Sequence, residues 1–112
     1  MKKLPILLAV LILSACSAKL LTPTQADVEK AEPKYPGTTL VQLTEGKQLY
    51  ENHCGNCHPH KDITKGSDEK WQQAVPRMVT KVNKKAGTPV LNEAKQNLIL
   101  KYVLAMRVAA KK

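Results

Sequence analysis

Apolar residues recur at helical spacing in three stretches of the chain. In the middle stretch they fall at i, i+4, i+7, i+8 and i+11 and form one stripe, made of Trp71, Val75, Met78, Val79 and Val82. A second stripe lies near the C-terminus, at Ala94, Leu98, Tyr102, Ala105 and Ala109. A shorter one precedes residue 54, where Gly46 and Tyr50 lie one turn apart. The pattern predicts an all-α domain with three helices.

Residues that favour helix starts stand before each stripe. We expect Thr44 to cap a helix that runs to about residue 54, Ser67 to cap the middle helix, and Asn92 to cap the last one. Pro76 lacks a backbone N–H, so the middle helix is expected to kink or to begin late. Residues 84–89 contain a glycine and a proline and are expected to form the next loop.

The first fifteen residues have the pattern of a secretory signal peptide. Two lysines follow Met1, and residues 4–13 form an apolar run that is too short to span a bilayer. Residues 13–16 resemble the lipobox of bacterial lipoproteins, in which the cysteine, here Cys16, becomes the acylated first residue of the mature chain. The alternative is an ordinary signal peptide with an incidental cysteine. We expect removal of residues 1–15 and a lipid anchor at Cys16.

Residues 16–40 are expected to form the lipidated cysteine and a flexible linker. Pro23, Pro33 and Pro36 interrupt helical and strand periodicity, and no apolar face is sustained. The folded domain is then expected to span residues 41–112. A domain of about seventy residues with few aromatic side chains needs a further source of stability besides its side-chain core.

Residues 54–58 form a C-x-x-C-H pentad, the pattern of covalent attachment of a c-type haem. On one helical face, Cys54 and Cys57 can each form a thioether to one porphyrin edge, and His58 can then be the proximal ligand of the iron. A dithiol redox pair and half of a zinc site are the alternatives. The first needs a βαβ pattern and the second needs two further ligands, and the sequence offers neither. One covalently bound haem c is therefore the expected cofactor.

The formal net charge of +9 bears on partners more than on fold. Basic and acidic residues balance between residues 17 and 40, so the excess belongs to the domain downstream. It could steer the domain toward an acidic protein partner or an anionic membrane, and a merely solvated lysine-rich surface is the alternative. Nucleic acid is not expected as a partner because the chain is expected to be exported.

The order of these features resembles the monohaem class I cytochrome c family over roughly residues 43–107. The resemblance implies the cytochrome c fold, with three to four helices around one covalently bound haem. It also implies that the first and last helices cross where Gly46 admits Tyr102, with Tyr50 beside them. Trp71 and Met78 resemble a W-x(6)-M segment that carries the axial methionine in small bacterial members. One departure is Pro59, which follows His58 where many members have glycine.

Two methionines compete for the sixth iron position. Met78 lies twenty residues past His58, which leaves enough chain to reach the opposite face of the haem, whereas Met106 lies on the helix expected to cross the first one. We expect Met78 to be the distal ligand, Trp71 to cover part of the haem, and Met106 to lie in the core. Met78 as another core side chain is the alternative.

A His/Met-ligated haem has no open position, so these features predict a carrier of single electrons and not an enzyme. Its expected partners are redox proteins with acidic docking surfaces, and its expected place is the periplasm-facing side of a membrane of the bacterial envelope. The residue after the acylated cysteine is Ser17, and a serine at this position resembles the pattern of lipoproteins that are sent on to the outer membrane. A haem-based ligand sensor and a fixed subunit of a larger oxidoreductase are the alternative functions.

Overall fold

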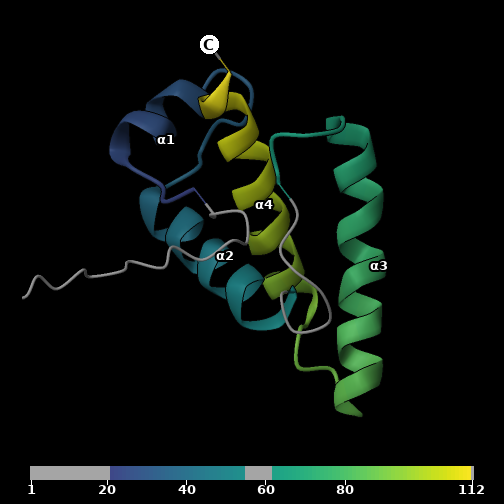
Figure 1. Cartoon of the computed structure of the whole chain (residues 1–112). Helices are drawn as coiled ribbons and strands as arrows, with labels where there is room; N and C mark the ends of the chain where they lie inside the picture. The colour runs from purple at the N-terminus through teal and green to yellow at the C-terminus, as the bar shows by residue number, and fades with distance from the viewer. Residues whose placement is uncertain (1–20, 55–61, 112) are drawn as a thin grey trace, which may run out of the picture.

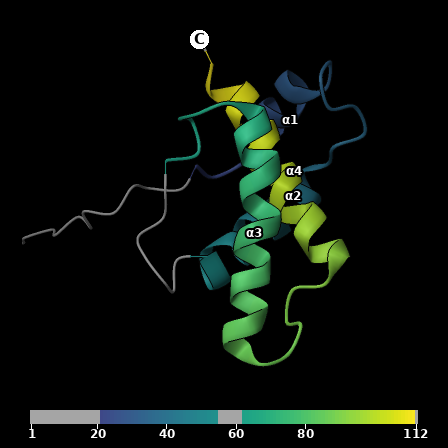
Figure 2. The ribbon, with the colours of Figure 1, turned by 90° about the vertical axis from the view of Figure 1, so that its right-hand side faces the viewer.

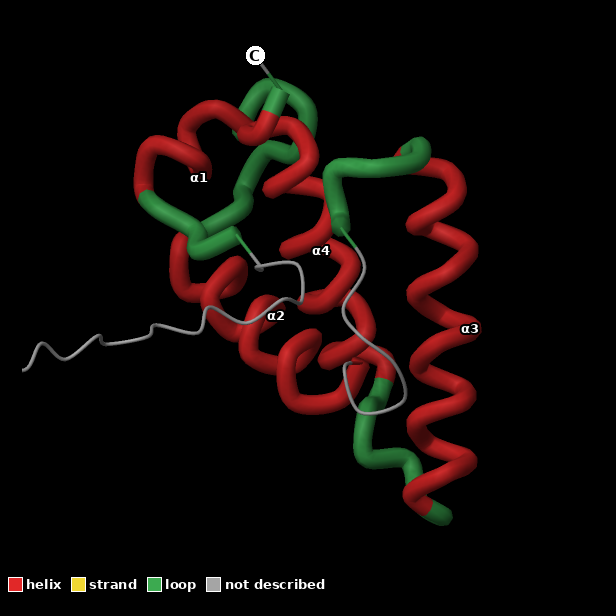
Figure 3. The backbone as a smooth tube through the Cα atoms, in the orientation of Figure 1, coloured by secondary structure: helices red, strands yellow, loops and turns green. Residues whose placement is uncertain are grey.

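Four helices make up the part of the chain that the computed structural model describes, which is residues 21–54 and 62–111 (Figure 1). They are α1 (Gln25–Ala31), α2 (Leu40–His53), α3 (Asp68–Ala86) and α4 (Glu93–Ala110). The described residues contain no strand, and Figure 3 shows them as helices and loops, so the predicted all-α class is confirmed.

The helix α4 lies between α3 on one side and α1 and α2 on the other (Figures 1 and 2). Six consecutive residues, 102–107, are buried on it, so α4 is enclosed around its whole circumference over that length. Met106 is among them with 3% of its surface exposed, which confirms its expected place in the core. Ala94, which was expected to belong to the apolar stripe near the C-terminus, is instead exposed in the first turn of α4.

The most extensive contact between helices joins α2 and α4, and Gly46 lies in it. A Cβ atom at Gly46 would lie 2.7 Å from the Cβ of Tyr102 and would overlap the carbonyl oxygen of Leu98. The ring of Tyr50 packs next to this point, with its centroid 6.3 Å from that of Tyr102. The expected contact of Gly46 with Tyr102 is therefore confirmed, because only a residue without a side chain permits this approach.

The N-terminal part of the described chain is packed on the bundle, and the expected flexible linker is wrong for this segment. Thr24 and Asp27 form a capping box that starts α1, and Val28 and Ala31 are buried. With the partly buried Tyr35 they make an apolar stripe at i, i+3 and i+7. Pro23 and Pro36 flank this stripe, and Pro33 lies within it but after the last residue of α1, so none of the three interrupts the helix.

The helix α2 begins about one turn earlier than predicted. Its N-cap is Thr39, whose hydroxyl accepts from the backbone N–H of Gln42 while the Gln42 side chain accepts from the backbone of Thr39. This reciprocal pair satisfies two N–H groups at the helix start, an advantage that Thr44 lacks. The earlier start adds a turn to the helix, and this turn contains the buried Leu43.

The caps of the last two helices are as predicted, at Ser67 and Asn92. The helix α3 continues through Pro76 to Ala86, so the late start does not occur and the expected loop begins only at Gly87. Gly87 ends the helix with a φ of +78°, a conformation that glycine adopts without steric cost. Figure 2 shows α3 lying in front of the other helices as one unbroken rod.

Candidate functional site

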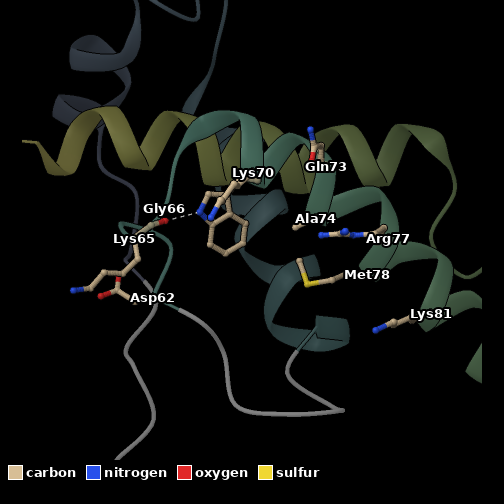
Figure 4. A pocket seen from close by; sticks show the side chains of 10 residues that line it. Asp62, Lys65, Gly66, Lys70, Gln73, Ala74, Arg77, Met78 and Lys81 are labelled. Atoms are coloured by element: carbon tan, nitrogen blue, oxygen red, sulfur yellow. Dashed lines mark hydrogen bonds between the residues drawn. The ribbon is translucent and has the colours of Figure 1, made fainter.

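A cleft of about 880 Å³ runs along one face of α3 and the loop that precedes it (Figure 4). Asp62, Lys65 and Gly66 line it from the loop. The lining residues on α3 extend from Lys70 to Lys81. They are single residues or pairs of adjacent residues that recur every three or four positions. That spacing keeps them on one helix face, so the amphipathic pattern of α3 itself creates this wall.

The apolar part of the wall is made by Trp71, Ala74 and Met78. Trp71 is 6% exposed, and its indole N–H donates to the carbonyl oxygen of Lys65 at 2.8 Å (dashed line in Figure 4). Met78 is partly buried and lines the cleft two turns further along α3 (Figure 4). The structure thus brings together the two residues of the W-x(6)-M segment.

Four cations line the same cleft, and sequence reasoning did not single them out. They are Lys65 from the loop and, from α3, Lys70, Arg77 and Lys81. Asp62 is the acidic residue among the described lining residues, and hydrogen bonds from the hydroxyl and backbone of Thr64 hold the pKa of its carboxyl below the usual value. The spacing of the α3 cations beside Trp71 and Met78 was a signal that could have located this wall.

The pentad is described only at its first residue. Cys54 is the C-cap of α2 and is 6% exposed. Cys57 and His58 lie outside the described residues, and so does Cys16 with the rest of the expected signal peptide. The roles expected of these residues therefore stay predictions.

The two competing methionines have different surroundings. Met106 is enclosed in the core, whereas Met78 lines the cleft. Of the two, Met78 is the one that a group in the cleft could contact. Ligation of iron by Met78 stays a prediction.

Within residues 21–54 and 62–111, no group of three or more His, Cys, Asp or Glu residues could hold a metal ion. No helix in that part of the chain is both long and apolar enough to cross a bilayer. Comparison with known protein families, with curated protein sequences and with solved structures found no match for this chain.

Proposed function

We propose that the chain is a lipid-anchored c-type cytochrome of the bacterial envelope, which carries single electrons between redox proteins through one covalently bound haem. The observation that carries this proposal is the combination of two features. One is the C-x-x-C-H pentad at residues 54–58, and the other is a cleft beginning at Asp62 that Trp71 and Met78 line.

The lining of the cleft fits a haem. Its volume of about 880 Å³ is within the range of small-molecule and cofactor sites, roughly 300–1,000 Å³. The apolar strip of Trp71, Ala74 and Met78 suits the face of a flat apolar ring. The cations at the margin, among them Lys70 and Arg77, suit the carboxylates that such a ring carries at its edge.

The covalent chain also limits how far the pentad can lie from the cleft. His58 is four residues from Asp62, which lines the cleft, and four residues of fully extended chain span at most about 14 Å. The connectivity therefore keeps the proposed proximal ligand within about 14 Å of Asp62, a lining residue of the cleft.

Each residue then has a defined role. Cys54 and Cys57 would hold the haem by thioether bonds, with His58 as the proximal and Met78 as the distal iron ligand. When bound, the haem supplies a one-electron redox centre. Trp71 excludes water from part of the cleft, and the thioether of Met78 favours a high reduction potential.

The packing of the bundle supports the cytochrome c fold as part of this proposal. The close approach of α2 to α4 at Gly46 and Tyr102 is the contact that the resemblance to class I cytochromes c implies. The proposed fold is therefore one in which these two helices form the frame and α3 carries the distal ligand.

The proposed membrane anchor is closer to the domain than a long linker would place it. The hydroxyl of Tyr102 donates to the carbonyl oxygen of Leu21 at 2.7 Å, so the first residue that the structure describes is already held against the bundle. Leu21 lies five positions after Cys16 in the sequence, a reach of at most about 18 Å. A domain anchored in this way would meet its acidic partners close to the membrane surface.

A pair of matched variants tests the ligand assignment. Met78→Leu and Met106→Leu both remove a sulfur and nearly conserve volume, so both should fold. We expect Met78→Leu to lose the absorption band of sulfur-ligated ferric haem and to bind carbon monoxide when reduced, while Met106→Leu keeps the band and binds none. The reverse result would overturn the assignment. Rapid binding of carbon monoxide by the unmodified protein would favour a ligand sensor instead.

A further inference from the structure

Arg107 is a buried cation that bonds almost entirely to one loop. It lies in the last turn of α4 and is 7% exposed. Its guanidinium donates to the Asp68 carboxylate from Nε at 2.7 Å and to three loop carbonyls, those of Ile63 at 2.8 Å, Lys65 at 2.9 Å and Gly66 at 2.7 Å. Desolvation of a charge is costly, and these four acceptors offset that cost.

The geometry of the guanidinium makes this a directional contact. Its N–H groups form a rigid planar fork, so carbonyls that bond to it are held at defined angles. Three carbonyls within residues 63–66 point at one group, and the conformation of this loop therefore depends on the position of Arg107. Gly66, with a φ of +80°, allows the sharp turn that this arrangement requires.

The same loop orients the indole of Trp71. The carbonyl oxygen of Lys65 accepts from Arg107 and also from the indole N–H of Trp71 at 2.8 Å. Lys65, Gly66 and Trp71 all line the cleft. Arg107 itself does not line it, so its influence on the cleft passes through this shared carbonyl.

The contact extends from the cleft to the N-terminal segment. The Asp68 carboxylate accepts from the Tyr35 hydroxyl at 2.9 Å and from the Lys34 ammonium at 2.8 Å. Both residues belong to the segment after α1 that was expected to be linker. Lys34 is mostly exposed, whereas Arg107 is buried, so the contact with Arg107 is the one less screened by salt.

We infer that Arg107 is a positioning residue for the cleft: through the loop of residues 63–66 it orients Trp71, and through Asp68 it links this orientation to Tyr35. The inference rests on the proposed function in one respect, which is that the oriented indole is taken to be a wall of a haem site. The contacts themselves are independent of any bound group.

Trp71 provides a direct test because it is the only tryptophan in the sequence. Arg107→Lys keeps the charge but replaces the planar fork by a single ammonium, which cannot hold three carbonyls and Asp68 together. We expect the NMR signal of the Trp71 indole N–H, which donates to the Lys65 carbonyl, to shift in the folded, full-length exported protein in its reduced, diamagnetic state. Tyr35→Phe removes one hydrogen bond to Asp68 without loss of ring volume and should give a smaller change in the same direction.

Thr24→Ala is the matched control. It removes the N-cap of α1, which lowers the stability of the protein, and it changes none of the groups that contact Arg107. We expect it to lower the unfolding midpoint with no change in the NMR signal of the Trp71 indole N–H. A folded Arg107→Lys variant that behaves like this control would show that Arg107 serves stability alone. Should Arg107→Lys fail to fold, an unchanged tryptophan signal in Tyr35→Phe overturns the inference.

The proposed function and the positioning role of Arg107 are tested by different measurements. Absence of covalent haem from the exported chain would remove the proposed function, and the effect of Arg107→Lys on the Trp71 indole N–H signal could still be measured. An unchanged indole N–H signal in the folded Arg107→Lys variant, with or without haem, would contradict the positioning role.

Discussion

A single hydrogen atom in place of a side chain sets the distance between α2 and α4. Gly46 faces the backbone of Leu98 and the Cβ of Tyr102 so closely that an added methyl group has no space. Backbone atoms of a buried helix cannot move aside cheaply, because the neighbouring interior is already close-packed. The residue is therefore expected to be among the least tolerant of change in the bundle.

Gly46→Ala should destabilise the protein by about 1–3 kcal/mol, the usual cost of overpacking, despite the better helix propensity of alanine. Urea unfolding followed by circular dichroism measures the change. Gln48→Ala, at an exposed position of the same helix, is the control and should leave stability within about 0.5 kcal/mol. Equal stabilities for the two variants would contradict the close packing of α2 on α4.

At the scale of single residues, the sequence predicted contacts for which a local anomaly is visible. A glycine within a helix is such an anomaly, because it costs about 1 kcal/mol relative to alanine. The core place of Met106 was predicted from its position on the last helix, which was expected to cross the first one. Met78 was predicted as an iron ligand, and its place in the lining of a cleft comes from the structure. The bonds of Arg107 did not, because its acceptors lie 39 to 44 positions away in the sequence. Its presence within an apolar run was a signal of burial, but not of its partners.

At the scale of elements, capping decided where the helices begin. Ser67 and Asn92 were correctly predicted because each stands immediately before a long amphipathic stripe. The start of α2 was wrong because Thr39 and Thr44 are both acceptable caps, and the reciprocal bond with Gln42 favours the first. The helix α1 was missed because its stripe is only two turns long, and packing on α4 stabilises it more than propensity does.

The start of α3 carries a prediction about pH. Hydrogen bonds from Lys34, Arg107 and Tyr35, in decreasing order of effect, hold the pKa of the Asp68 carboxyl well below its usual value. A carboxyl whose pKa is lower in the folded state stabilises the fold above its unfolded pKa, near 3.9. That contribution is lost as the pH falls below this value toward the folded pKa.

Asp68→Asn removes this dependence. We expect the variant to be less stable than the unmodified protein at pH 7, and the difference between the two to shrink as the pH falls from about 5 to 2. Urea midpoints measured across this range provide the comparison. Parallel stability curves for the two proteins would show that the ionised Asp68 carboxylate does not stabilise the fold.

At the scale of the whole molecule, the positive charge is not spread evenly around the proposed site. Lys65, Lys70, Arg77 and Lys81 all line the cleft, with Asp62 as the opposing charge among the described lining residues. Such a concentration of one sign raises the local concentration of anionic partners and their association rate. We therefore assign the proposed docking of acidic redox partners to the rim of this cleft.

Lys81→Glu should slow oxidation of the reduced protein by hexacyanoferrate(III), an anionic probe, several-fold at low ionic strength, and the effect should fade at high salt. Lys95→Glu is the matched control, because Lys95 is an exposed helical lysine that does not line the cleft. Stopped-flow absorbance measures both rates. Equal slowing by the two variants would mean that net charge, and not the rim of the cleft, governs the encounter.

The central claim is that the pentad holds a haem covalently. Absorbance and haem-dependent peroxidase staining of the exported protein after a denaturing gel test it most directly, because only a covalently bound haem stays with the unfolded chain. The account predicts a haem signal at the position of this chain and its loss when Cys54 and Cys57 are both replaced by serine. A correctly exported protein without any haem signal, from cells that attach haem to other cytochromes, would contradict it.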